Sequence, residues 1–255
     1  MKQKRPQTWR KRDAIWLCLA LVLLIAFVLW QNNDLTVTQY TAHTKKETPA
    51  GGLKIVQVSD LHNKAFGKQN ENLLAQIRAQ NPDFILLTGD TVDSRRTDIE
   101  IALDFAAAAT EIAPVYFVSG NHENRLPIDR KTAFYTGLRQ NGVQLLNDET
   151  KTVSVRGCEI VLVGLDDAHL ADGTLQILCA DLPENTLQIL LAHEPQELAN
   201  YAAAGVDFVF SGTPTAGRCA CRLSAGLPRP TKAFSRSTMR GYLPNRIRFC
   251  ISVGV

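Results

Sequence analysis

LKIVQVSDLH at residues 53–62 is a short apolar run that ends in aspartate and histidine, and FILLTGD at residues 84–90 repeats the pattern and ends in aspartate. Short apolar runs bounded by turn residues are typical of buried strands. Between the two runs, residues 70–80 carry leucine and isoleucine at helical spacing. Strands that alternate with helices in this way predict an α/β domain.

The same alternation continues toward the C-terminus. Apolar, β-rich runs predict further strands, and segments with helical spacing separate several of them. The predicted strands are residues 115–119, 143–146, 152–155, 160–164, 187–192 and 206–210, and the predicted helices are residues 99–112, 132–139 and 195–204.

Four loops that follow these predicted strands carry side chains that bind metal ions. They read SDLH (59–62), GDTVD (89–93), GNHE (120–123) and AHEP (192–195). Asp, Asn and His supply the oxygen and nitrogen donors that divalent ions use, and open α/β sheets bind ligands at the carboxyl ends of their strands. Taken alone, each loop has an ordinary explanation, such as the turn chemistry of Gly-Asp. Together they predict a pair of ions, which roughly 3.5–4 Å apart would clamp both oxygens of a phosphoryl displacement.

The order and spacing of the four loops resemble those of the calcineurin-like metallophosphoesterase family, over residues 53–212. The resemblance implies an α/β sandwich of two sheets flanked by helices. It also implies two divalent ions of the Mn, Fe or Zn class, and hydrolysis of phosphate mono- or diesters by a metal-bound hydroxide.

The resemblance also implies a role for each metal-binding residue. Asp60 and His62 would hold the first ion, Asn121 and His193 would hold the second, and Asp90 would bridge the two. Simple chemistry agrees with this allocation, because a carboxylate has two oxygens with which to bridge two cations and a single imidazole does not bridge.

Two further residues receive catalytic roles from the same resemblance. His122 would face the substrate and would donate to the phosphoryl group or protonate the leaving oxygen. Asp93 would form a hydrogen bond with His122 and hold its orientation. A histidine oriented by a carboxylate is a suitable general acid.

The resemblance stops after Gly212. The family closes its site with a Gly-His-x-His loop that supplies one more histidine to each ion. Here Gly212 is followed by TPTAGR, and the sequence contains no histidine after His193. Each of the two metal shells is therefore expected to lack one ligand, and the chain is expected to be weakly active or inactive.

We interpret the change as a shift of reading frame just after Gly212. Codons can be chosen for GHTHGGQVRLP that encode residues 212–222 as they stand once a single C is deleted after the first codon. Residues 213–255 contain eight Lys or Arg and no acid, and are expected to pack poorly. Two alternatives remain open for this tail: a basic segment that binds a membrane surface or nucleic acid, and an unstructured terminus with its own role.

The N-terminus has a different pattern. Residues 1–12 contain six Lys or Arg and no acid. They predict a basic cytoplasmic flank (1–13), a transmembrane anchor (14–30) and a linker (31–52), because about 17–25 apolar residues span a bilayer and basic flanks stay inside. A cleaved signal peptide and a buried soluble helix are the alternatives.

These patterns together predict a single-pass protein of the cell membrane with its catalytic domain on the extracytoplasmic side. The expected substrate is a small-molecule or lipid-linked phosphoester. Nucleic acid is not expected as a partner, because the basic residues of the tail are scattered among proline and glycine and form no helical face. The alternative to an impaired enzyme is a catalytically inactive, membrane-anchored remnant of one.

Overall fold

The structure is a computed structural model that describes residues 11–31, 35, 37–96, 98–170, 173–212 and 245–252. The chain divides into two compact units, residues 1–35 and 36–255. In the first unit, α1 extends from Lys11 to Gln31 over the predicted anchor. Among the residues that the structure describes, no helix is both long and apolar enough to cross a membrane, so the predicted transmembrane segment is not supported.

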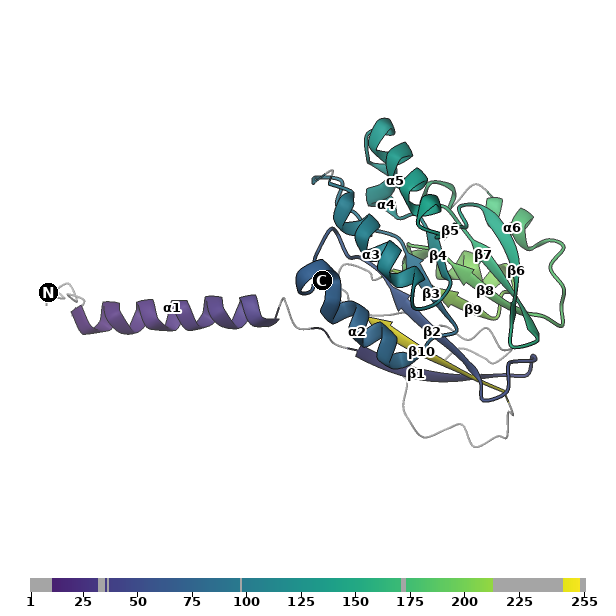
Figure 1. Cartoon of the computed structure of the whole chain (residues 1–255), viewed down its shortest axis with the longest axis horizontal. Helices are drawn as coiled ribbons and strands as arrows, with labels where there is room; N and C mark the ends of the chain where they lie inside the picture. Colours follow the sequence, from purple (N-terminus) through teal and green to yellow (C-terminus); the bar gives the residue numbers. More distant parts are fainter. Residues whose placement is uncertain are drawn as a thin grey trace, which may run out of the picture. The chain divides into compact units, whose positions relative to one another are not determined.

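The second unit contains two β-sheets (Figure 1). The first sheet has six strands in the order β1-β10-β2-β3-β4-β5, and β1 is antiparallel to its neighbour while the others run parallel. The strands of this sheet are β1 (Val37–Thr44), β2 (Leu53–Val58), β3 (Phe84–Thr88), β4 (Val115–Val118), β5 (Gln144–Leu145) and β10 (Asn245–Ser252).

The second sheet has four strands in the order β6-β7-β8-β9. A hairpin joins β6 to β7, and the remaining pairs are parallel. Its strands are β6 (Glu149–Val155), β7 (Cys158–Gly164), β8 (Leu187–Leu191) and β9 (Phe208–Phe210). The strand predicted at residues 143–146 forms β5 and pairs with β4 in the first sheet. The strands predicted at residues 152–155 and 160–164 form β6 and β7 in the second sheet.

Alternating side chains place the main core between the two sheets. Phe84 and Leu86 of β3 and Ile189 of β8 point into this shared core, as expected for strands whose side chains alternate between faces. Helices cover the outer faces of both sheets (Figure 1). Beside the first sheet lie α2 (Glu71–Gln80), α3 (Glu100–Thr110) and α5 (Ile128–Gln140). Beside the second sheet lie α6 (Thr174–Cys179) and α7 (Leu198–Ala203).

Short helical segments complete the unit. They are α4 (Asn121–Asn124) and three single 3₁₀ turns, η1 (Lys68–Asn70), η2 (Asp167–His169) and η3 (Pro195–Glu197). The prediction of an α/β fold with two sheets and flanking helices is confirmed by this arrangement.

Two predictions for the ends of the domain are wrong in part. The predicted linker at residues 31–52 contains β1, which forms an edge of the first sheet. Within the tail, residues 245–252 form β10, which is inserted between β1 and β2 with Ile247 opposite Leu53. Backbone hydrogen bonds to both neighbours give this segment a defined place that its acid-free composition did not predict; residues 213–244 and 253–255 lie outside the described part of the chain.

The topology brings the four predicted loops to one edge of the sandwich. β2, β3 and β4 run parallel in the first sheet, so the loops after them leave the same edge. The loop after β8 approaches from the second sheet, next to the end of β9. Gln57 joins the two sheets there, because its amide nitrogen donates to Thr88 Oγ1 and to the carbonyl of Ser211, each at 2.7 Å.

Candidate metal centre

The loops after β2 and β3 run side by side and are joined by backbone hydrogen bonds. The N–H of Asp60 donates to the carbonyl of Gly89 at 3.1 Å, and the N–H of His62 donates to the carbonyl of Asp90 at 2.9 Å. Asp60, His62 and Asp90 all have left-handed backbones, with φ of 56°, 46° and 52°. A left-handed backbone is uncommon for non-glycine residues, and here it turns both loops so that these three side chains lie at the carboxyl edge of the sheet.

Gly120 allows the third loop to approach the second. A Cβ built on Gly120 would lie 2.4 Å from Asp90 Oδ1, closer than any non-bonded contact allows. Its missing side chain lets α4 begin directly against the Asp90 carboxylate, whose Oδ1 accepts the N–H of His122 at 2.9 Å. Any larger residue at position 120 would push the two loops apart.

Two groups of side chains offer ligand atoms that lie within 4.8 Å of one another. One consists of Asp60, Asp90 and His193, and the other of His62, Asp90 and His122. Asp90 belongs to both groups, which is the position that a bridging carboxylate requires. Its Oδ2 lies 3.2 Å from His193 Nε2, 3.8 Å from His62 Nε2 and 4.0 Å from His122 Nε2.

His193 is oriented by the strand next to it. Its Nδ1 lies 2.8 Å from the carbonyl oxygen of Thr88, and this oxygen can only accept, so the ring donates there and presents Nε2 to the centre. Burial opposes the charged imidazolium, but the hydrogen bond and the negative charge of Asp90 outweigh it and raise the pKa of His193 to about 10. The same pairing with His193 overcomes burial and lowers the pKa of Asp90.

Asn121 has one amide atom that no protein group satisfies. Its Nδ2 lies 3.3 Å from Glu194 Oε1, which fixes which way the amide points. Its Oδ1 is buried and has no hydrogen-bond partner among the described residues. A buried oxygen without a partner is costly, and a divalent ion would satisfy it, so the position fits the predicted ligand role.

The surroundings of His122 differ in part from the prediction. Asp93 Oδ1 lies 3.4 Å from His122 Nδ1, which places the carboxylate beside the ring. The hydrogen bond to Nδ1 comes instead from the backbone N–H of Ser94 at 3.1 Å. Because a nitrogen that accepts this bond carries no proton, the neutral ring holds its proton on Nε2. Burial is the main cause that lowers the pKa of His122.

The geometry also permits a role for His122 that the resemblance does not assign. Its ring packs edge-on against His62, with ring centroids 4.5 Å apart, and both lie close enough to Asp90 to share an ion. Unlike these two imidazoles, the side-chain amide of Asn121 is positioned by its contact with Glu194. Five of the seven predicted side chains, Asp60, His62, Asp90, His122 and His193, converge on one region, and Asp93 lies beside His122. The individual roles of all seven stay predictions.

Glu123 has a supporting role that the sequence reasoning did not assign. The side chain is 0% exposed, and its two oxygens accept four backbone N–H groups at 2.7–3.2 Å. Three of these belong to residues 90–92 and one to Gly120, so Glu123 ties the Asp90 loop to the start of α4. Burial, followed by the charge of Asp90, raises the pKa of Glu123 to about 7. A glutamate three residues after a helix N-cap is the sequence signal that could have identified it.

Metal binding is expected to release a proton. The raised pKa means that His193 in the metal-free protein is protonated at neutral pH, whereas a ligand imidazole must be neutral. The affinity for Mn²⁺ is therefore expected to rise up to about tenfold per pH unit between pH 6.5 and 8. Isothermal titration calorimetry in HEPES and in Tris measures this release as a buffer-dependent enthalpy. An enthalpy that is the same in both buffers would contradict it, and His193→Asn should abolish the difference.

Comparison with known proteins identifies a family and several relatives. The sequence model of the family described as calcineurin-like phosphoesterase matches residues 53–212. An uncharacterised metallophosphoesterase of Aquifex aeolicus (strain VF5) is 27% identical over 149 residues, which cover 58% of this chain and 55% of that protein. The uncharacterised metallophosphoesterase YkoQ of Bacillus subtilis (strain 168) is 26% identical over 205 residues, 78% of this chain and 75% of YkoQ.

Among solved structures, TT1561 of Thermus thermophilus aligns with a TM-score of 0.48 and 15% identity, covering 62% of this chain and 80% of TT1561. A phosphopantetheinyl hydrolase from Mycobacterium tuberculosis aligns with a TM-score of 0.40 and 16% identity, covering 57% of this chain and 70% of that one. The family match spans more than half of the chain and contains all four metal-binding loops. The chain belongs to the calcineurin-like phosphoesterase family.

Proposed function

We propose that the chain is a metal-dependent phosphoesterase whose centre holds two divalent ions of the Mn, Fe or Zn class. The observation that carries the proposal is the position of Asp90, which is 4% exposed and shared by both groups of potential ligands. By the resemblance, Asp60 and His62 would complete one shell, and Asn121 and His193 the other. In the structure, the ligand atoms of Asp60 lie with those of His193, and the ligand atoms of His62 lie with those of His122. When bound, such a pair of ions lowers the pKa of water and neutralises the charge of a phosphoryl group.

The protein's own residues position the reacting groups. Asp90 holds its place through the N–H of His122 on one oxygen, while its other oxygen faces three imidazoles. His193 is fixed by Thr88, and Glu123 holds the backbone beneath the centre. This support limits movement of the ligand side chains, which is what a two-ion site requires in order to favour one substrate geometry.

His122 would donate a hydrogen bond to the substrate. With Nδ1 accepting from Ser94, the proton on Nε2 faces the side of Asp90 and is available to a phosphoryl or leaving oxygen. Asp93 beside the ring would stabilise the imidazolium form, and burial disfavours it. Because burial has the larger effect, the ring stays mainly neutral near pH 7, in the form that donates a hydrogen bond from Nε2.

We propose further that this version of the centre is impaired. A Cβ on Gly212 would lie 2.8 Å from His193 Nδ1, and the Gly212 N–H donates to the carbonyl of His193 at 2.8 Å. The chain therefore leaves β9 directly against a predicted ligand, at the place where the family supplies its last two histidines. Position 213 is threonine here, and so is position 215.

Restoring two imidazoles tests the impairment. The variant Thr213→His with Thr215→His is expected to bind Mn²⁺ at least about tenfold more tightly than the original chain, because it returns one ligand to each shell. It should also hydrolyse bis(p-nitrophenyl) phosphate faster. Calorimetry, metal analysis of the dialysed full-length chain and release of p-nitrophenol measure the two effects. The matched control is Thr231→His with Thr238→His, which adds two imidazoles elsewhere in the same tail.

The outcomes separate the proposal from its alternative, a non-catalytic remnant that binds at most one ion. Two Mn²⁺ per chain with turnover in the unaltered protein would exclude the remnant and the impairment. Restored turnover only in the T213H/T215H variant would support an impaired phosphoesterase. If neither protein binds two ions or hydrolyses the diester, the proposed function is wrong for this chain.

The substrate and the location of the domain stay predictions. A small-molecule or lipid-linked phosphoester fits the proposed chemistry, and the mono- or diester preference follows from comparing p-nitrophenyl phosphate with its diester. The extracytoplasmic position rests on the basic residues 1–13 and on the predicted anchor at residues 14–30. Digestion of the domain by a protease added to intact cells would support that position, and protection would contradict it.

A further inference from the structure

We propose that Arg95, Arg96 and Arg125 form an anion-binding rim beside His122, which holds a second phosphate group on the leaving side of the substrate. The inference rests on the proposed function, because it takes His122 as the group that faces the leaving oxygen. It names the class of substrate that the site prefers: a phosphoester whose leaving group carries another phosphate. We call these three residues the arginine rim.

The first two members lie on a turn that is attached to both histidine-bearing loops. An antiparallel bridge pairs Asp93 with Arg96, and the N–H of Arg96 donates to the carbonyl of Asp93 at 2.9 Å. On one side, the N–H of Ser94 donates to His122 Nδ1 at 3.1 Å. On the other side, Asn63, the residue after His62, donates from Nδ2 to the carbonyl of Arg96 at 2.8 Å. The backbone of Arg95 and Arg96 is thereby fixed next to the centre.

Arg125 approaches from the other end of the His122 helix. Its N–H donates to the carbonyls of Asn121 and His122, at 3.1 and 3.2 Å, where it ends α4. Its charge acts on the His122 ring, adding to the effect of burial. Cations thus stand on two elements that contact His122, the turn before it in sequence and the helix end after it.

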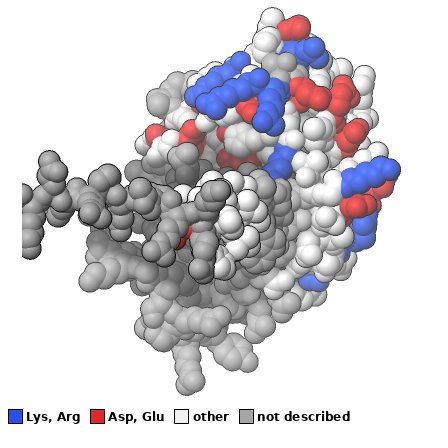
Figure 2. Space-filling model, turned by 90° about the vertical axis from the view of Figure 1, so that its left-hand side faces the viewer, with Lys and Arg blue, Asp and Glu red and all other residues white. Residues whose placement is uncertain are grey.

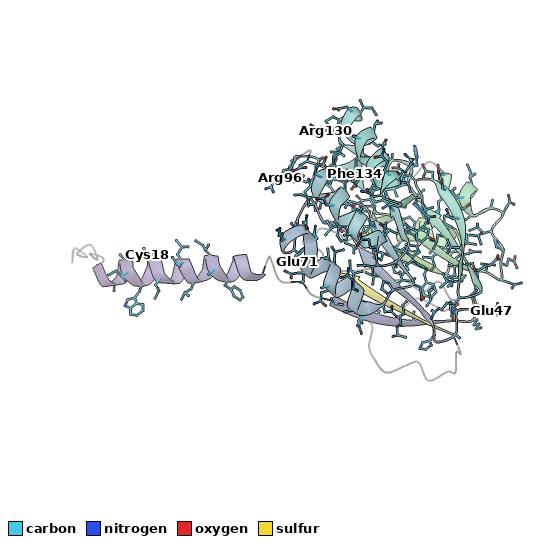
Figure 3. All side chains as sticks on the ribbon, in the orientation of Figure 1. Cys18, Glu47, Glu71, Arg96, Arg130 and Phe134 are labelled. Atoms are coloured by element: carbon cyan, nitrogen blue, oxygen red, sulfur yellow. The ribbon has the colours of Figure 1, made fainter. Side chains whose placement is uncertain are left out.

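The side chains of the rim are exposed and carry no compensating ion pair. All three are exposed to solvent, and among the described residues no carboxylate lies within salt-bridge distance of their guanidinium groups. The carboxylate of Asp93 accepts the Arg95 N–H and lies beside His122, and the charge of Arg95 is among the causes that lower the pKa of Asp93. Figure 2 shows Lys and Arg side chains in the upper part of the face, interspersed with Asp and Glu side chains. Figure 3 labels Arg96 on this side of the domain.

Three arginines close together in the sequence and the fold are unexpected from the composition of the domain. Residues 13–212 contain 14 basic and 25 acidic residues, so a typical surface of the domain is acidic. Guanidinium groups are planar donors that match phosphate in two-point contacts. The scissile phosphate would occupy the ion centre at Asp90, and His122 stands between that centre and the rim. A second phosphate in the leaving group is therefore the anion that the rim can reach.

Binding of matched nucleotides to the full-length, Mn²⁺-loaded chain tests the rim. The probes are adenosine 5′-monophosphate and adenosine 3′,5′-bisphosphate, which differ by one phosphate. The unaltered chain is expected to bind the bisphosphate at least about tenfold more tightly at low salt. The triple variant R95A/R96A/R125A should lose this preference and keep its affinity for the monophosphate. The control is Arg78→Ala, an exposed arginine on α2. Both basic termini are present in every protein and so do not affect the comparison.

The results distinguish a failure of the arginine rim from a failure of the proposed function. A preference for the bisphosphate that survives in R95A/R96A/R125A, or that R78A removes equally, overturns the rim. An equal affinity for both nucleotides in the unaltered chain overturns it too. If the preference depends on the rim but no variant hydrolyses a phosphoester, the rim stands as an anion site and the proposed function fails. If hydrolysis occurs without the preference, only the rim is wrong.

Discussion

The variant Asp90→Asn is expected to bind Mn²⁺ at least about 100-fold more weakly than the unaltered chain, at both positions of the centre. Changes one shell further out cost about 10–100-fold, and Asp90 is the single carboxylate shared by the two groups of ligands. The amide has the same shape, but it offers one oxygen in place of two and no negative charge. Loss of that charge also removes the partner that keeps His193 protonated in the metal-free protein.

Calorimetric titration and metal analysis after dialysis measure this effect without any need for turnover. Asp104→Asn is the matched control, because Asp104 is an exposed aspartate on α3 away from the centre. The control should bind metal like the unaltered chain. Retention of two tightly bound ions in D90N would contradict the assignment of Asp90 as the bridge, and loss of only one ion would reduce it to a ligand of a single metal.

The variant Glu123→Gln is expected to lower the free energy of unfolding by about 2–6 kcal/mol. Each oxygen of Glu123 accepts two backbone N–H groups. In glutamine one of these oxygens becomes an NH₂ group, so two buried N–H donors would face another donor, each at a cost of about 1–3 kcal/mol. All four donors lie in residues 90–92 or at Gly120, beside the centre. The ligand side chains on these loops should therefore become more mobile as well.

Urea unfolding of the metal-free protein, followed by circular dichroism, separates this effect from metal binding. Glu111→Gln is the control, since Glu111 is exposed at the end of α3 and its substitution should change stability by no more than about 0.5 kcal/mol. A variant E123Q as stable as the control would show that the four N–H groups find other partners. That result would remove Glu123 from the support of the centre.

The strands that carry the site could be predicted because each is defined locally. Residues 53–58 and 84–88 form β2 and β3 at the bounds expected from their apolar runs. Both faces of these parallel strands are covered, so nearly all of their positions are buried and the runs are mostly apolar. The polar loops behind them were identified for the same reason, because Asp, His and Asn interrupt the apolar pattern where each strand ends.

Other parts could not be predicted, because they depend on long-range pairing. β10 lies between β1 and β2, almost two hundred residues away along the chain. Neither the composition of the tail nor the polar sequence of β1 shows that partner. Ser94 was missed for a related reason: its backbone N–H donates to His122 Nδ1, with its Oγ 3.3 Å from the same nitrogen, and a backbone group gives no signal in the sequence.

By itself, the sequence determined the α/β class, the four loops that carry side chains of metal-binding type and the absence of histidine after His193, since residue identity and spacing are sufficient for each. The tertiary structure alone decided that Asp90 stands between two groups of potential ligands, that Glu123 joins two loops and that the Ser94 N–H meets the ring of His122. These contacts join loops that follow different strands. They arise only when parallel strands bring their carboxyl ends to the same edge.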